Sequence, residues 1–306
     1  MPPLDDDEAI ANGHVIDQDA TALTLDDTVR SKYAIVPDGD TFPTVHLDRT
    51  TPPRGICPGK PHQQHQPLSP WAVFSTGPLL TVEECQAWIQ NANDLELETG
   101  DFIFKTGAKG YERMKTGGRR FSSTTVVHDT VFAEKAAAIL HRPESLVPLV
   151  LGNGKVFTGV RSRFLVSKYT QGQFFAPHFD GNVLEDDPDE SLLGSQSEFT
   201  AVLYLSDDFE GGATLYLPSA TGDRDDENSN NENGNHWSEV KEPVAVRPAA
   251  GCAVAHRAFT VMHGGGKVLQ GVKYIMQFGI MYAEPATTAT SNIKDDEAPH
   301  SFRWAV

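Results

Sequence analysis

The spacing of apolar residues is typical of helices in one early stretch of the chain. The segment "LLTVEECQAWIQNAN" (79–93) places Thr81 three residues before Glu84, which is the spacing of a capping box. We therefore predict that Thr81 starts a helix, with Leu80, Cys85, Trp88 and Ile89 facing a core. The segment "TVFAEKAAAILHR" (130–142) predicts a second helix, which ends before a proline.

From residue 156 onward the apolar residues alternate with a period of two, which indicates strands separated by Gly- and Pro-containing turns. Many short strands after two helices predict an α+β fold that is mainly β, an antiparallel sandwich or jelly roll with a helical layer on one side. The predicted strands are 156–169, 199–207, 213–218, 244–248, 251–256 and 272–282.

Several polar segments interrupt or flank this pattern. We expect residues 1–68 to form an irregular or partly disordered arm rich in Asp and Pro, and residues 284–306 to form a polar tail. The domain between them, 69–283, contains an Asn/Asp-rich stretch at 219–236 that we interpret as a solvated insertion. The Gly-rich, basic segment 104–123 predicts a long loop, either a lid or simply a solvated loop.

The composition excludes several classes of protein. A net charge of -17 over 306 residues opposes the binding of nucleic acid. Three widely spaced cysteines without a CxxC pair fit neither a disulfide framework nor a zinc site. The N-terminal residues lack the features of a secretory signal, and no apolar run approaches the ~20 residues of a membrane span. We therefore expect an intracellular protein, cytoplasmic or nuclear, without a membrane segment.

Two polar side chains stand out within the apolar stretch "FFAPHFDG" (174–181). On a strand, residues i and i+2 share a face, so His178 and Asp180 point the same way. Two histidines and one carboxylate form the facial triad of non-haem Fe(II) oxygenases, which leaves three metal positions open. The pair therefore predicts a metal site that needs a further histidine.

The strands downstream offer two histidines for that place, His256 and His263, whereas His236 and His300 lie in polar segments. His263 follows an apolar run, and Lys273 comes ten residues later at the start of the next strand. A buried cation at that place suits the distal carboxylate of a dicarboxylate co-substrate, because the two charges compensate each other.

Three ordered blocks of the chain resemble the 2-oxoglutarate- and Fe(II)-dependent dioxygenases of the prolyl 4-hydroxylase type. The blocks are "RFLVSKYTQGQFFAPHFDG" (163–181), "FTAVLYLSDDFEGGATLYLP" (199–218) and "VRPAAGCAVAHRAFTVMHGGGKVLQGVKYIMQFGIMY" (246–282). The resemblance implies a double-stranded β-helix, or jelly roll, supported by N-terminal helices. It does not extend to the arm, the insertion or the tail.

Residue roles follow from the resemblance position by position. It implies that His178, Asp180 and His263 bind iron and that Lys273 pairs with the distal carboxylate of 2-oxoglutarate. It also implies contacts from Tyr169 and Thr200 to that co-substrate. Where relatives often carry Arg and Asp, this chain has Gln277 and Gly279, which changes the floor of the pocket. For the substrate we name Arg119, Arg120 and Gln277 as candidate contacts.

The resemblance implies hydroxylation of an unactivated C–H bond, with O2 consumed and succinate and CO2 released. Ascorbate is the implied reductant. It favours a peptide or protein residue such as proline as substrate, and fold alone assigns no substrate. Three alternatives stay open: the same chemistry on a free small molecule, a non-catalytic module that binds metal and 2-oxoglutarate, and a cupin-like metalloprotein. The sequence indicates no oligomeric state.

Overall fold

The computed structural model describes eight stretches of the chain: residues 42–59, 69–95, 97–100, 102–107, 110–115, 120–187, 190–218 and 238–285. The predicted insertion 219–236, most of the predicted arm (1–41 and 60–68) and the tail from residue 286 lie outside the described residues.

Two helices are present in the described part of the chain, both where the sequence predicts them: α3 (Val82–Asp94) and α4 (Thr130–Leu140). The capping box of α3 forms, because the Thr81 side chain accepts from the backbone N–H of Glu84 while the Glu84 carboxylate accepts from that of Thr81. Asp129 caps α4 by accepting from the backbone N–H of Phe132. Neither helix is long and apolar enough to span a membrane, and the described residues contain no other helix.

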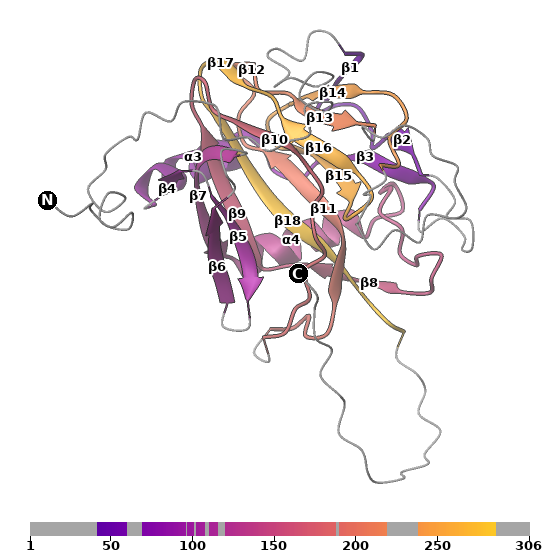
Figure 1. Cartoon of the computed structure of the whole chain (residues 1–306). Coiled ribbons are helices and arrows are strands. Elements are labelled where there is room, and N and C mark those ends of the chain that lie inside the picture. The colour runs from indigo at the N-terminus through magenta and orange to yellow at the C-terminus, as the bar shows by residue number, and fades with distance from the viewer. Residues whose placement is uncertain are drawn as a thin grey trace, which may run out of the picture.

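Strands form the rest of the fold, which confirms the prediction of a mainly β protein (Figure 1). They are β1 (Thr44–His46), β2 (Gly55–Pro58), β3 (Trp71–Pro78), β4 (Glu98–Gly100), β5 (Phe102–Gly107), β6 (Gly110–Lys115), β7 (Arg120–His128), β8 (Val156–Val160), β9 (Arg163–Tyr169), β10 (Phe174–His178), β11 (Gln196–Tyr204), β12 (Glu210–Gly211), β13 (Thr214–Leu217), β14 (Val244–Arg247), β15 (Cys252–Arg257), β16 (Met262–Gly265), β17 (Val268–Gln270) and β18 (Lys273–Ala283).

The main sheet curls into a jelly roll with two faces. Its strand order is β1-β14-β13-β16-β10-β7-β9-β18-β11-β15-β3-β2, and every pairing along it is antiparallel except that of β1 with β14. One face is therefore β14-β13-β16-β10 and the other is β9-β18-β11-β15. Strands β1 and β2, which lie within residues 1–68, extend the two ends of the sheet.

The period-two pattern of β18 shows how the layers are separated. Tyr274, Met276 and Phe278 face outward and pack in one apolar cluster with the buried residues of α3 and α4. The residues between them, Lys273, Ile275 and Gln277, take the opposite face of the strand. The two helices therefore cover the outer side of the β9-β18-β11-β15 face. Lys273 and Gln277 of β18 lie on the inner side of this face, toward the interior of the barrel.

The structure corrects the interpretation of segment 104–123. We predicted a long loop there, but β5 and β6 pair as a hairpin and β7 begins at Arg120. The glycines and basic residues were taken as loop signals, but this hairpin meets its backbone hydrogen bonds by strand pairing. Strand β7 also bridges the two faces, since it pairs with β10 on one side and β9 on the other.

Candidate metal centre

The pairing of β10 with β16, within one face of the barrel, brings the HxD pair against the downstream histidine. His178 ends β10 and stands directly opposite His263 of β16 in the antiparallel register. Asp180 follows two residues after His178 and returns to the same side. Ligand atoms of these three residues all lie within 4.8 Å of one another, which forms the one cluster of this kind in the described part of the chain.

The hydrogen bonds of the two histidines leave one nitrogen of each turned toward Asp180. Nδ1 of His178 lies 2.8 Å from the carbonyl of Ala176, and Nδ1 of His263 lies 3.1 Å from that of Val261. A carbonyl only accepts, so each Nδ1 carries the proton and each Nε2 keeps its lone pair. The Nε2 atom of His178 is buried and has no hydrogen-bond partner. An orphaned lone pair of this kind fits a metal ion.

Distances within the cluster are short enough for a shared ion. His178 Nε2 lies 3.4 Å from Asp180 Oδ1, and His263 Nε2 lies 3.5 Å from Asp180 Oδ2. The ring of Phe175 stacks on His178 with centroids 3.8 Å apart, which fixes the plane of the imidazole. The donor set of two imidazoles and one carboxylate suits a divalent first-row metal such as iron.

The pKa values of Asp180 and His263 are both shifted toward the protonation states that bind a cation. Burial alone raises the pKa of Asp180, but the neighbouring imidazoles of His263, His178 and His256 offset this and hold it well below its usual value. Burial, followed by the nearby charges of His256 and His178, holds the pKa of His263 well below its usual range. An ionised carboxylate and a neutral imidazole are the forms that bind metals.

The cluster is open to solvent on one side. The side chains of His178 and Asp180 are 19% and 14% exposed, whereas that of His263 is 5% exposed. Beside this opening Phe259 has a φ of 61°, a left-handed conformation that is rare for an aromatic residue. Its backbone N–H donates to the carbonyl of Asp180 at 2.8 Å, so the strained turn holds the Asp180 backbone.

Two side chains contact Asp180 in a way that the sequence alone did not predict. His256 Nε2 lies 3.1 Å from Asp180 Oδ2, and Gln277 Nε2 lies 3.3 Å from the same oxygen. We considered His256 as a metal ligand and Gln277 as a substrate contact. The signal that could have pointed to them is a polar residue on an apolar strand, but only the packing of the β9-β18-β11-β15 face against β10 places them beside Asp180.

Lys273 lies buried in the barrel, next to the predicted Tyr169. The register places Lys273 opposite Tyr169, and its Nζ lies 5.7 Å from the centre of the Tyr169 ring. The ammonium donates to the carbonyl of Gly212 at 2.7 Å, and among the described residues it forms no ion pair with a carboxylate. Burial lowers the pKa of Lys273 to about 7. This uncompensated buried cation fits an anionic ligand.

Gly265, which has no side chain, lies between the histidine cluster and Lys273. Gly265 lies two residues after His263 on β16 and therefore shares its face. A β-carbon built on Gly265 would lie 3.7 Å from Phe175 Cβ and 4.0 Å from Lys273 Nζ. Two strand residues span about 7 Å, which is comparable with the length of an extended five-carbon dicarboxylate. Because Gly265 has no side chain, the space bordered by Gly265, Phe175 and Lys273 is long enough for such a dicarboxylate. We call this space the cradle.

The other described candidates lie next to these groups through an intervening residue: Thr200 stands opposite His256, and Arg120 stands opposite Phe175. Thr200 pairs with Gly279, six residues (279 minus 273) along β18 from Lys273, which is about 20 Å of strand. Arg119 lies outside the described residues. Arg120 is 1% exposed rather than in a solvated loop, and its guanidinium lies 4.8 Å from the ring centre of Phe175. It donates to the hydroxyls of Ser122, Thr124 and Ser167.

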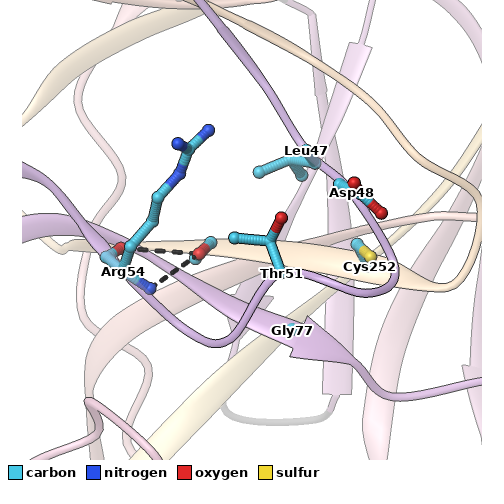
Figure 2. Close-up of a pocket in the computed structure, with 7 residues that line it drawn as sticks. Leu47, Asp48, Thr51, Arg54, Gly77 and Cys252 are labelled. Atoms are coloured by element: carbon cyan, nitrogen blue, oxygen red, sulfur yellow. Dashed lines mark hydrogen bonds between the residues drawn. The ribbon is translucent and has the colours of Figure 1, made fainter.

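A separate small cavity lies where the segment after β1 crosses β3 and β15 (Figure 2). Here the backbone N–H of Arg54 donates to the hydroxyl of Ser75 at 3.0 Å. Its volume of about 10 Å³ holds a single water at most, so it is not a ligand site. The lining residues are Leu47, Asp48, Thr51, Arg54, Ser75, Gly77 and Cys252.

The fold and this cluster together define a class of protein. Residues 164–280, which span most of β9 through most of β18, match the family model of the 2OG-Fe(II) oxygenase superfamily. This match confirms the resemblance that the three sequence blocks predicted. Residues 164–280 thus match a superfamily of oxidoreductases that use Fe(II) and 2-oxoglutarate. No curated protein sequence matches the chain.

Solved structures that are similar to this chain include the following three. A viral collagen prolyl hydroxylase from Paramecium bursaria Chlorella virus-1, in complex with 2-oxoglutarate, is 17% identical with a TM-score of 0.38, covering 69% of this chain and 96% of that one. A Trichoplax adhaerens prolyl hydroxylase, bound to a hypoxia inducible factor peptide, is 14% identical with a TM-score of 0.40, covering 70% and 84%. The epimerase SnoN of nogalamycin biosynthesis is 15% identical with a TM-score of 0.39, covering 75% and 88%.

Proposed function

We propose that this protein is a 2-oxoglutarate- and Fe(II)-dependent hydroxylase that acts on a peptide or protein residue such as proline. The observation that carries the proposal is the pairing of two complementary sites within one barrel. A cluster of His178, Asp180 and His263 fits a divalent metal. The buried ammonium of Lys273, on the other side of the open space at Gly265, fits an anionic group.

Each residue has a defined task in this proposal. The Nε2 atoms of His178 and His263, which the surrounding hydrogen bonds leave free, would hold iron together with the carboxylate of Asp180. The ammonium of Lys273 binds the distal carboxylate of 2-oxoglutarate, and the Tyr169 hydroxyl donates to the same carboxylate. When bound, iron and 2-oxoglutarate together supply the activation of O2 for C–H oxidation, with release of succinate and CO2.

The barrel wall controls what reaches the metal. Phe175 and the strands behind it exclude water from the side of Lys273, while the exposed side of His178 and Asp180 admits the substrate. Phe259, 48% exposed beside Asp180, offers an apolar surface at this opening. The proposed peptide or protein substrate follows from the resemblance to the prolyl 4-hydroxylase type, and ascorbate is the proposed reductant.

The direct test adds Fe(II) and then 2-oxoglutarate to the full chain without oxygen. We expect a visible charge-transfer band that saturates with 2-oxoglutarate, followed on admission of air by release of succinate in the presence of a substrate from peptide or metabolite pools. A band without succinate release from any pool would favour a non-catalytic binding module. Absence of the band would contradict the proposed co-substrate, and release with small molecules alone would correct the substrate class.

The cradle at Gly265 gives a second prediction. We expect Gly265→Ala to fold normally, because the added β-carbon would meet nothing closer than 3.7 Å. It should nevertheless weaken 2-oxoglutarate binding at least about tenfold, since the methyl group would fill space needed by the co-substrate. Titration of the metal-loaded protein with 2-oxoglutarate measures this effect.

Gly264→Ala is the matched control for that titration. Its β-carbon would lie 2.9 Å from the carbonyl oxygen of Phe175 and would point away from the cradle. It should therefore lower the melting temperature without a selective effect on 2-oxoglutarate. Unchanged 2-oxoglutarate affinity in Gly265→Ala would show that the co-substrate lies elsewhere.

A further inference from the structure

A buried histidine links the metal centre to a tyrosine behind it. His256 of β15 is 0% exposed and stands between Tyr216 of β13 and Asp180. Its Nε2 atom lies 3.1 Å from Asp180 Oδ2, and its Nδ1 atom lies 3.2 Å from the hydroxyl of Tyr216. Both ring nitrogens of His256 therefore have partners within the protein, whereas Nε2 of His178 has no hydrogen-bond partner.

The direction of these hydrogen bonds follows from the partners. A carboxylate that binds a metal only accepts, so the Nε2 of His256 must be the donor to Asp180. With the proton of His256 on Nε2, Nδ1 can only accept, so the hydroxyl of Tyr216 is the donor of the 3.2 Å hydrogen bond between them. The hydrogen bonds thus run from Tyr216 through His256 to Asp180, and the tautomer of His256 is opposite to that of His178 and His263.

The two oxygens of Asp180 are treated differently by their surroundings. Oδ2 accepts from His256 and from Gln277, whose Nε2 lies at 3.3 Å. Oδ1 has neither of these donors and lies 3.4 Å from the Nε2 of His178, while Oδ2 also lies 3.5 Å from the Nε2 of His263. A carboxylate held in this way presents one oxygen to an ion next to His178, because the lone pairs of the other are already engaged.

We propose that His256 is a positioning residue that, with Tyr216 behind it and Gln277 beside it, makes Asp180 a one-oxygen ligand of the metal. This inference rests on the metal site of the proposed function. A one-oxygen carboxylate and two imidazoles occupy three positions of an octahedron and leave three for co-substrate and oxygen. A two-oxygen carboxylate would fill a fourth position and crowd the open face.

The test uses Co(II) as the probe, added to the full chain without 2-oxoglutarate, and measures the dissociation constant and the visible ligand-field spectrum. His256→Phe keeps the ring volume and removes the donor, and we expect it to weaken Co(II) binding about 10- to 100-fold and to shift the spectrum at saturation. His256→Gln keeps an amide donor of similar reach and should restore both readouts to within about threefold. Tyr216→Phe should give a smaller loss of the same sign.

Tyr282→Phe is the matched control for Tyr216→Phe. Tyr282 is equally buried, but its hydroxyl donates to the carbonyl of Pro148 at 2.8 Å, on the outer side of the sheet. We expect it to change neither the Co(II) affinity nor the spectrum. Comparing the two variants separates the loss of the hydrogen bond from Tyr216 to His256 from the general effect of losing a buried hydroxyl.

The outcomes separate this inference from the proposed function. If the unaltered protein does not bind Co(II), the metal site itself is wrong. If it binds and His256→Phe binds equally well with the same spectrum, only the positioning role is overturned. Equal loss in His256→Phe and His256→Gln would make His256 a direct ligand or a packing residue, which also overturns the inference. If His256→Phe does not fold, the Co(II) affinity and spectrum of His256→Gln and Tyr216→Phe are compared with those of Tyr282→Phe. Identical values in Tyr216→Phe and Tyr282→Phe would then overturn the positioning role.

Discussion

Replacing His178 by alanine is expected to abolish 2-oxoglutarate-dependent succinate release. The change removes one of the three ligand atoms that lie within 4.8 Å of one another. Loss of an outer partner of a metal ligand already costs about 10- to 100-fold in affinity, so loss of a ligand should cost more than about 100-fold. Calorimetric titration with Mn(II) and an assay of succinate release measure the two consequences.

The fold of His178→Ala should survive, which makes the result interpretable. Nε2 of His178 is buried without a partner, so removing it relieves an unsatisfied polar group. His46→Ala is the matched control, because His46 is an exposed residue at the end of β1. It should retain full activity. Succinate release above about a tenth of the unaltered rate in His178→Ala would exclude this histidine as an iron ligand.

Replacing Lys273 by methionine is expected to remove saturable binding of 2-oxoglutarate while leaving the metal site intact. The ammonium is the one buried cation that the proposed function assigns to the co-substrate, and it lies across the Gly265 cradle from His263. We expect a loss of at least about 100-fold in 2-oxoglutarate affinity, the scale for removing one partner of a buried ion pair. Titration of the metal-loaded protein monitors the loss.

The same change should make the protein more stable near neutral pH. Burial lowers the pKa of Lys273 from 10.5 to about 7, so the folded state holds this proton less tightly than the unfolded state does. Below about pH 7 both states bind the proton and folding carries the full penalty, and between about 7 and 10.5 stability rises with pH. Methionine removes the penalty but leaves the carbonyl of Gly212 without its donor. We expect a net gain of about 1–3 kcal/mol at pH 6.

Lys168→Met on the neighbouring strand is the control for both readouts. Lys168 pairs with Tyr274 in the register and donates to the side chain of Asn93, on the outer side of β9. We expect little change in 2-oxoglutarate affinity or in unfolding, measured by denaturant titration at pH 6 and 9. If Lys273→Met bound 2-oxoglutarate normally, the lysine would be a structural residue and another cation would have to hold the co-substrate.

Gly-rich and basic composition proved to be a poor guide for segment 104–123. Turn residues signal a loop only when the backbone has no strand partner, and that partner is set by tertiary pairing. Here β7 is needed to join β10 to β9, and it buries Arg120 among three hydroxyl groups. Nothing in the local sequence indicates that an arginine between glycines and serines enters the barrel.

The sequence by itself determined the class and the chief chemical groups of this protein. The period of two along 156–282 predicted the β fold, and the HxD pair with a histidine and a lysine downstream predicted the metal and co-substrate sites. These features are local or depend on one strand register, because residues two apart on a strand share a face. The family match over residues 164–280 confirmed the class.

The tertiary structure decided which of the buried polar groups meet. Thr200, His256 and Gln277 lie on three different strands, and their neighbours depend on how β15, β11 and β18 are aligned. That alignment moves Thr200 away from Lys273 and places His256 and Gln277 on one oxygen of Asp180. Register between strands that are distant in sequence is set by packing of the whole barrel, so no local pattern encodes it.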